Sequence, residues 1–383
     1  MEFCKIGYDK LGNFITEYTD RNSNNQFRPV AVGRYGIRTR ESIYSKELAK
    51  DYSKNKVIYK DTLTVGMGSV QIDIGVLTDD VIYSVSPAYH TYKISGINSS
   101  YLRYCLECRN QDMFQRYVKR GSRQGKTIDL KRWIGYEIPM YDNDIQLKIV
   151  DRLNRAKHLI ELRQQELEKL ELLIKARFVE MFGDPVYNEK QWPTQKLIDM
   201  CDSIVDCPHS TPNYTTENTG YMCIRTSIVK KNKILWDEIE YISEQEFYQR
   251  IQRKRPEKGD IVYTREGAIL GIAAIIDREY NVALGQRSML LSPNKMICVS
   301  EFLSVAMNCD SFLENALKGI SGSASPHINV GDIKEFKMIL PPIELQNQFA
   351  DFVQQVDKSK VVVQKHLEKA QLLFDSLMQE YFG

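Results

Sequence analysis

The fold of this chain is decided by a stretch that occurs twice, QLKIVDRLNRAKHLIELRQQELEKLELLIKARFVEMFG at residues 146–183 and QNQFADFVQQVDKSKVVVQKHLEKAQLLFDSLMQEYFG at residues 346–383. A shift of 200 positions aligns the two copies without a gap. The triplet Leu-Glu-Lys at 167–169 returns at 367–369, and both copies end in Phe-Gly. An internal repeat of this length indicates that the chain is built from two similar halves.

Each copy is predicted to form one long helix. Residues at alternating steps of four and three form a narrow stripe along one side of a helix, which is the coiled-coil pattern. The stripe consists of Ile149, Leu153, Ala156, Ile160, Arg163, Leu167, Leu170, Ile174, Arg177 and Met181 in the first copy, and of Phe349, Val353, Val356, Lys360, Val363, Leu367, Ala370, Phe374, Leu377 and Tyr381 in the second. About 37 residues make a rod of roughly 55 Å. Each rod could pack along its own globular domain, but two matched rods favour an intramolecular helical pair.

Length and composition describe an ordinary globular protein. The 383 residues leave room for two or three domains, and 43% of them are apolar and 27% charged. No run of about 20 apolar residues occurs and the first residues lack a signal-peptide pattern, so we expect a cytoplasmic protein without a membrane partner. Eight scattered cysteines predict no disulfide framework, and the single CxxC formed by Cys105 and Cys108 is weak evidence for zinc.

The net charge of +2 conceals a difference between the halves. Residues 1–140 hold 22 Lys and Arg against 15 Asp and Glu, a net charge of +7. Residues 184–340 hold 18 against 21, a net charge of −3. A basic first half suits a polyanionic partner, although this excess alone does not identify one.

Each rod is preceded by a block of mixed secondary structure. In the first block we expect strands between residues 57 and 72 with a turn at 66–69, a helix at 99–118 and a closing strand at 133–139. In the second block we expect strands at 261–263 and 272–276, a helix at 300–317 and a closing strand at 336–340. The matching order predicts four parts: a first globular domain (1–140), a central helix (141–183), a second globular domain (184–340) and a distal helix (341–383).

No motif predicts an active site. The segment at 121–127 resembles a phosphate-binding loop, but it has three residues between its glycines where the motif requires four. The segment at 184–187 resembles a methyltransferase motif only superficially, because it lacks the second proline. The five histidines have neither metal-ligand spacing nor a neighbouring nucleophile pattern. We therefore predict no catalytic residue, no metal site and no cofactor.

Both blocks contain a polar loop before the closing strand. Arg, Lys, Gln and Asn pair with base edges, while Ser and backbone amides hold phosphates. Such side chains are Arg120, Ser122, Arg123, Gln124 and Lys126 in the first loop, and Ser321, Ser323, Ser325, His327 and Asn329 in the second. Taken alone, the loops are equally well interpreted as solvated connections.

At the level of the whole chain, the sequence resembles the specificity (S) subunits of type I restriction–modification systems. The resemblance covers nearly the full length as domain, helix, domain and helix, and the repeat is its most specific part. Shorter matches are LPPIELQ at 340–346, EMFGDP at 180–185, GDIVYTREG at 259–267, GQR at 285–287, PHIN at 326–329 and SPAY at 86–89. Residues 66–68 lack the arginine of the corresponding family turn, and the opening at 138–146 lacks the Pro-Pro pair.

The resemblance implies an α+β fold, in which two mixed α/β target-recognition domains are separated by two long antiparallel helices that form an intramolecular coiled coil with a pseudo-twofold repeat. It implies that each domain reads half of a bipartite, asymmetric site in double-stranded DNA and that the helices set the spacer and dock methylation subunits. It adds Arg265, Gln286 and Arg287 to the candidate DNA-binding residues. It places catalysis in partners, namely a DNA methyltransferase (M) subunit that uses S-adenosylmethionine and an ATP-dependent restriction (R) subunit.

Two alternatives remain at this point. The chain could be a non-catalytic coiled-coil scaffold whose two heads bind proteins, and a DNA affinity that falls steeply with salt would favour DNA binding over this interpretation. It could also be a self-contained nuclease or methyltransferase, although the motifs for such an enzyme are missing from the sequence.

Overall fold

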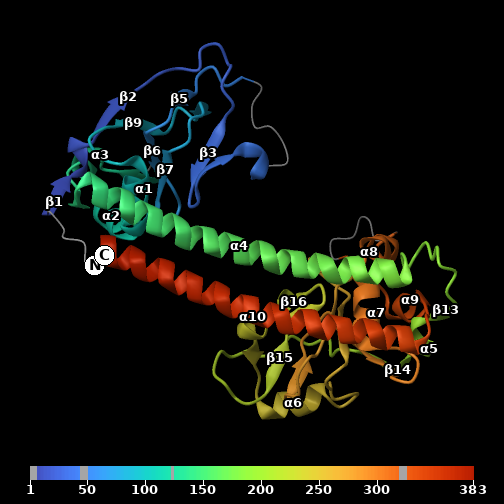
Figure 1. Cartoon of the computed structure of the whole chain (residues 1–383). Helices are drawn as coiled ribbons and strands as arrows, with labels where there is room; N and C mark the ends of the chain where they lie inside the picture. The colour runs from blue at the N-terminus through green and yellow to red at the C-terminus, as the bar shows by residue number, and fades with distance from the viewer. Residues whose placement is uncertain (1–6, 44–50, 122–124, 319–325) are drawn as a thin grey trace. The chain divides into compact units, whose positions relative to one another are not determined.

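The computed structural model describes residues 7–43, 51–121, 125–318 and 326–383 (Figure 1). The chain divides into two compact units. Unit 1 comprises residues 1–164 and 365–383, and unit 2 comprises residues 165–364. Each unit therefore contains one globular domain together with part of each long helix.

Unit 1 is a mixed α/β domain. Its elements are β1 (Gly7–Lys10), β2 (Ile15–Tyr18), β3 (Val30–Gly33), β4 (Gly36–Thr39), β5 (Lys56–Ile58), β6 (Thr62–Met67), β7 (Ile72–Leu77), β8 (Tyr83–Val85), β9 (His90–Ile94), α1 (Ser99–Cys108), α2 (Asn110–Tyr117), β10 (Val118–Gly121), β11 (Gly125–Ile128), α3 (Leu130–Trp133), β12 (Glu137–Met140), the first part of α4 (Asn143–Phe182) and the last part of α10 (Ile343–Phe382).

Unit 2 repeats this plan with different loops. Its elements are the rest of α4, β13 (Thr194–Lys196), α5 (Leu197–Met200), β14 (Cys201–Asp206), β15 (Met222–Ile224), β16 (Val229–Lys230), β17 (Lys233–Ile234), β18 (Glu240–Tyr241), α6 (Glu244–Arg250), β19 (Ile261–Thr264), β20 (Ala273–Ile275), β21 (Val282–Leu284), β22 (Ser288–Pro293), α7 (Ser300–Met307), α8 (Asp310–Ala316), α9 (Val330–Lys334), β23 (Lys337–Ile339) and the first part of α10.

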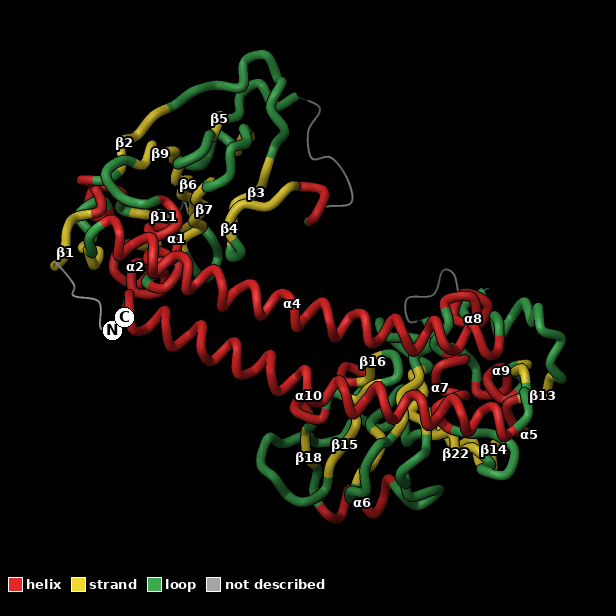
Figure 2. Tube along the Cα trace, viewed as in Figure 1, coloured by secondary structure: helices red, strands yellow, loops and turns green. Residues whose placement is uncertain are grey.

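Both units are built on a four-stranded antiparallel sheet with the same strand order. The order is β2-β9-β6-β7 in unit 1 and β14-β22-β19-β20 in unit 2. The central strand β22 is buried along its whole length, including the two serines, Ser288 and Ser292, that flank its apolar centre. The closing strands also correspond, because β12 pairs with β1 and β23 pairs with β13. Figure 2 labels β1 and β13, the partners of these closing strands.

Two buried asparagines hold the sheets in the same way. The side chain of Asn110 donates to the carbonyl of Ile72 at 2.9 Å and accepts from its amide at 3.0 Å. Asn308 makes the same pair of bonds to Ala273, at 2.7 and 3.1 Å. These residues join a helix to the first residue of the edge strand, β7 or β20, so the repeat extends from the rods into the globular domains.

These asparagines lie where the sequence predicted unbroken helices, and there the prediction needs correction. The segment at 99–118 forms α1 and α2, and the segment at 300–317 forms α7 and α8. Each helix breaks next to its asparagine, because the side chain is turned inward to bond the sheet backbone. The predicted closing strand at 133–139 begins only at Glu137, and the turn expected at 66–69 starts later because β6 continues to Met67.

The two 40-residue helices confirm the predicted rods and their apolar stripe. All twenty stripe positions are buried or half-buried. In unit 2, the ring of Phe178 near the end of α4 packs 5.5 Å from that of Phe349 near the start of α10. In unit 1, Arg152 of α4 donates to the hydroxyl of Tyr381 at 3.1 Å. The start of each helix thus packs against the end of the other, as the predicted antiparallel pair requires.

The helices also complete the two hydrophobic cores. In unit 1, the ring of Phe382 lies 5.1 Å from that of Tyr101 on α1, and both are fully buried. In unit 2, the ring of Phe182 lies 4.9 Å from that of Phe302 on α7. Among the described residues, no helix is apolar over a long enough stretch to cross a membrane.

Candidate nucleic-acid interface

The polar segments singled out in the sequence gather at one edge of each main sheet. In unit 2, the register places the end of β14 and the end of β19 beside the start of β22. In unit 1, the ends of β2 and β6 lie beside the start of β9 in the same manner. We call these two regions the loop edge of unit 1 and the loop edge of unit 2.

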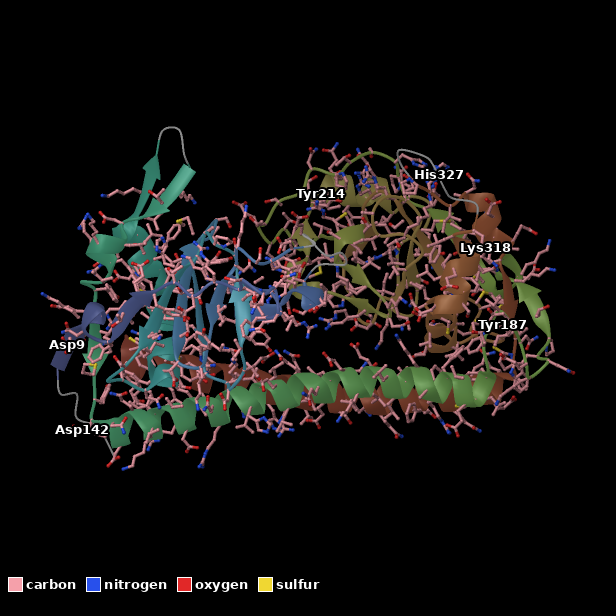
Figure 3. All side chains as sticks on the ribbon, turned by 90° about the horizontal axis from the view of Figure 1, so that it is seen from above. Asp9, Asp142, Tyr187, Tyr214, Lys318 and His327 are labelled. Atoms are coloured by element: carbon pink, nitrogen blue, oxygen red, sulfur yellow. The ribbon has the colours of Figure 1, made fainter. Side chains whose placement is uncertain are left out.

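Backbone hydrogen bonds assemble the loop edge of unit 2 from three separate segments. The amide of Arg265 donates to the carbonyl of Arg287 at 3.0 Å, and the carbonyl of Arg265 accepts from the amide of Ile328 at 2.9 Å. Glu266 forms a β-bridge with His327. The three family-like motifs at 259–267, 285–287 and 326–329 are therefore neighbours in space. Figure 3 shows His327 and Tyr214 on the side of unit 2 opposite its parts of α4 and α10.

The side chain of Arg265 is buried inside this edge. Only 5% of the residue is exposed, and its guanidinium contacts Asp206 at 2.8 and 3.2 Å. A third contact joins it to Glu266 at 2.5 Å. Bidentate arginine–carboxylate pairs are among the strongest and most directional polar contacts. This geometry gives Arg265 the means to fix the end of β14 to the end of β19.

Arg287 has the opposite environment. Its side chain is exposed, and no carboxylate among the described residues pairs with its guanidinium. Its backbone has a φ of +71°, a left-handed conformation that is uncommon for residues other than glycine. The guanidinium of Arg287 is therefore an exposed cation without a paired carboxylate among the described residues, and it lies in a tight turn directly before β22.

Gln286 connects the edge to a loop that the sequence analysis did not include. The hydroxyl of Thr211 donates to the side-chain oxygen of Gln286 at 3.1 Å. Thr211 belongs to the segment at 207–214, where His209 lies 3.1 Å from Asp206. The buried guanidinium of Arg250 holds the same segment by donating to the carbonyl of Ser210 at 2.7 Å. The available signal was the run CPHSTPNY, which is polar, rich in proline and directly follows a strand.

The remaining candidates of unit 2 lie before α9. His327 and Asn329 are exposed, and the side chain of Asn329 donates to Asp332 at 3.0 Å. Ser323 lies outside the described residues, as do Ser321 and Ser325.

In unit 1, the polar loop is a hairpin formed by β10 and β11. Arg120 lies in β10 and Lys126 in β11, whereas Arg123 and Gln124 lie outside the described residues. The ammonium of Lys126 donates to the carbonyl of Ser69 and lies 5.2 Å from the ring centre of Phe114. Lys126 thus joins the hairpin to the β6–β7 turn. Figure 3 shows this hairpin projecting from unit 1 on the side away from α4.

The cysteines have the environment of core residues. Burial raises the pKa of Cys201, Cys223 and Cys309 to about 12, and it also raises the pKa of Cys108. A thiol with a raised pKa is a poor nucleophile and a poor metal ligand, because both roles require the thiolate. Within the part of the chain that the structure describes, no group of three His, Cys, Asp or Glu side chains could hold a metal ion.

Comparison with known proteins defines the class. Residues 189–372 match the family described as type I restriction modification DNA specificity domain. The S subunit of a type I restriction–modification system from M. genitalium has a similar structure, with 13% identity over 98% of this chain and 96% of that chain and a TM-score of 0.56. A structure that addresses complex assembly and conformational transition of the type I R-M system has 17% identity over 98% of both chains and the same TM-score, 0.56. No curated protein matches the chain by sequence.

Residues 189–372 therefore belong to the type I restriction–modification DNA specificity domains, a family of DNA target recognition. The chain as a whole has the fold of a type I S subunit, with two mixed α/β domains and a long α4 packed against α10. The resemblance inferred from the repeat is confirmed.

Proposed function

We propose that this chain is the DNA-recognition subunit of a type I restriction–modification complex, in which each globular domain reads one half of a bipartite, asymmetric DNA site. The observation that carries the proposal is the pair of loop edges. The same sheet edge carries unrelated polar side chains in the two units, which suits two different half-sites read from one scaffold. The division at residues 140, 183 and 340 into two target-recognition domains and two helices is part of this proposal.

The residues proposed to contact DNA separate into two groups. Arg287, Gln286, His327 and Asn329 in unit 2 and Arg120, Arg123, Gln124 and Ser323 in the polar loops are proposed contacts to bases or phosphates. Arg265 and Lys126 are proposed to act by positioning these loops, because the guanidinium of Arg265 is buried against Asp206 and Glu266 and the ammonium of Lys126 joins the hairpin to the β6–β7 turn.

Catalysis is proposed to lie in partner subunits. An M subunit would supply methylation with S-adenosylmethionine, and an R subunit would supply ATP-dependent cleavage. Support comes from the family, whose S subunits are the non-catalytic recognition component, and from a relative solved in work on complex assembly. A cytoplasmic location follows from a role on chromosomal or incoming DNA.

Repeated apolar pairs on the helices support docking of two equal partners. Leu172 and Leu173 of α4 are 61% and 47% exposed, and their repeat partners Leu372 and Leu373 of α10 are 69% and 49% exposed. These leucines form an exposed apolar surface at the same position of both repeats. Exposed apolar surfaces of this kind are typically buried in an interface with another protein. We propose that each pair contacts one M subunit. The helices, each about 60 Å long at 1.5 Å per residue, are proposed to set the spacer between the half-sites.

An exchange of domains tests the central proposal. Replacing residues 1–140 with the equivalent domain of a relative should change one half of the methylated sequence and leave the other half intact. The readout is methylation mapping in a host that carries the matching M subunit. A change in both halves would contradict independent reading. A scaffold that binds proteins through its heads would show no salt-dependent DNA binding in the purified complex.

A further inference from the structure

A cavity opens at the loop edge of unit 1, and none of the candidate DNA-binding residues from the sequence lines it. Its volume is about 560 Å³, and its lining residues are Arg21, Ser23, Ser53, Lys54 and Pro87. Two of these five side chains are cationic and none is anionic. Arg21 follows β2, and Pro87 belongs to the segment that enters β9.

The backbone around the cavity is held in register by two hydrogen bonds. The amide of Asn22 donates to the carbonyl of Asn55 at 2.9 Å, and the amide of Val57 donates to the carbonyl of Asp20 at 2.8 Å. Together these two bonds form a β-bridge between Arg21 and Lys56. The two segments that carry the cations are therefore fixed to each other like paired strands.

Buried polar side chains also hold these two segments in place through hydrogen bonds. Asn22 is 1% exposed, and its amide group donates to the carbonyls of Phe27 and Tyr52 at 3.1 and 3.2 Å. Asn55 donates to the hydroxyl of Ser84 at 3.2 Å, which ties the cavity floor to the strand before Pro87. Buried hydrogen-bonded groups rigidify the surrounding structure, so the cavity exists before any ligand arrives.

The two cations remain available to a ligand. One guanidinium nitrogen of Arg21 donates to the carbonyl of Lys54 at 2.7 Å, which leaves most of its five N–H groups free. Among the described residues, neither Arg21 nor Lys54 has a carboxylate within ion-pair distance. The neighbouring carboxylates are engaged elsewhere, since Asp51 accepts two bonds from Ser53 and Asp20 accepts one from Tyr59.

The cavity occupies the place that corresponds to the Gln286 contact in unit 2. There, the loop after β14 meets the segment before β22 through the bond from Thr211 to Gln286. In unit 1, the loop after β2 and the segment before β9 border the cavity at Arg21 and Pro87. The same junction of the fold thus carries a neutral polar contact in one unit and a pair of cations in the other.

We propose that this cavity binds backbone phosphate of double-stranded DNA, with Arg21 and Lys54 as the phosphate ligands and Ser23 as a further donor. The inference rests on the proposed function, because it assumes that the loop edge of unit 1 faces DNA. Arginine, lysine and serine are the side chains that commonly hold phosphates, and such contacts fix the position of a protein on DNA without reading sequence. The cavity would therefore contribute affinity and placement, not base discrimination.

The test compares two double variants of the full chain, each in complex with its M subunits. R21A/K54A removes both cations of the cavity. K10A/K60A removes two exposed lysines outside it and changes the net charge equally. Binding is measured across a series of salt concentrations to a duplex carrying the methylated sequence and to a scrambled duplex of equal length. For R21A/K54A we expect the slope of log affinity against log salt to become shallower by about 1 to 2, since each lost phosphate contact removes about 0.9. Both duplexes should lose affinity by the same factor, and K10A/K60A should keep the original slope.

Several results would contradict the proposal that the cavity binds DNA phosphate. An unchanged slope in R21A/K54A would overturn the phosphate assignment, and so would a selective loss on the methylated sequence, which would indicate base reading. If inorganic phosphate at constant ionic strength raised the unfolding temperature of the original chain but not of R21A/K54A, while the DNA slope stayed equal, the ligand would be free phosphate and the proposal would be wrong. R21K should retain most of the slope if charge is what matters. Failure of the proposed function looks different, because the original complex would then show no salt-dependent binding to any duplex.

Discussion

The loop edges of the two units occupy the same place in the same sheet, yet they are held together by different chemistry. In unit 2, a buried arginine joins two carboxylates and leaves exposed Arg287 and His327 around it. In unit 1, buried amide groups such as Asn22 and Asn55 hold the edge, and the cations line an open cavity. Beneath the edges, Asn110 and Asn308 make the same pair of bonds to the backbone of the edge strand. The two halves of the repeat therefore share the asparagine bonds that support the main sheet. They differ in the side chains that surround the loop edge of that sheet.

The largest effect is expected from Arg265→Ala. The substitution removes the buried guanidinium that pairs with both Asp206 and Glu266, and breaking such a pair costs about 3 kcal/mol or more of unfolding free energy. Urea denaturation of the purified chain measures the loss. Arg278→Ala is the matched control, because its ion pair with Asp277 is exposed, and it should stay within about 1 kcal/mol of the original.

An Arg265→Ala variant of unchanged stability that had lost DNA binding would reverse this interpretation. Arg265 would then contact DNA directly, as the resemblance to the family implies, and the difference between the two loop edges would be smaller than we infer.

The asparagines should behave alike in the two units. Asn110→Ala and Asn308→Ala each remove two side-chain bonds to the edge strand and leave its first amide unpaired and buried, so each should lower the unfolding free energy by about 2 kcal/mol. In unit 2, the carbonyl of Ala273 keeps its bond from the amide of Asn232. Asn24→Ala, at an exposed position, serves as the control in the same denaturation experiment. A large effect in one unit alone would show that Asn110 and Asn308 do not support their sheets equally. The claim that the two units share these supporting contacts would then be wrong.

Arg287→Gly separates recognition from stability. Glycine tolerates the positive φ of this position, so the fold should be unharmed while the guanidinium is removed. If Arg287 contacts a guanine edge, discrimination against a changed base pair should fall by about 1–3 kcal/mol. Competition binding with duplexes altered at single positions measures this. Lys295→Ala, an exposed lysine beyond the other end of β22, should change nothing. Equal discrimination in both variants would remove Arg287 from the interface.

The smallest effect is expected from Lys126→Met. The variant loses the bond to Ser69 and the contact with Phe114, so the free energy for opening of the β10–β11 hairpin should fall by about 1 kcal/mol. Amide hydrogen exchange of the hairpin against the main sheet measures it. Unchanged exchange together with weaker DNA binding would make Lys126 a DNA ligand and not a positioning residue.

The sequence was most informative where one period governs many residues. The alternating stripe predicted two long helices and their mutual packing, because seventeen of its twenty positions are apolar and only Arg163, Arg177 and Lys360 are charged. Sequence reasoning failed at Asn110 and Asn308, since a polar residue within a helical pattern gives no sign that it faces a sheet. It also missed Arg21, Lys54 and the loop at 207–214. These residues become a site only when strand pairing brings them beside Pro87 or Gln286, and such pairings are long-range contacts that no local pattern encodes.

Unit 1 is formed by two separate stretches of the sequence, and this affects how the protein folds while the ribosome synthesises it. Tyr381 and Phe382 complete a core whose other members, such as Tyr101, are made some 280 residues earlier. At 5–20 residues per second, that interval lasts on the order of 14–60 s. During this time the aromatic core residues of the first domain lack the part of α10 that covers them. Unit 2 is contiguous in the sequence, so all of its core residues are synthesised before unit 1 is complete. A nascent chain halted before the last 20 residues should therefore expose its first-made domain to proteases and chaperones, although every residue of that domain's sheet has already been synthesised.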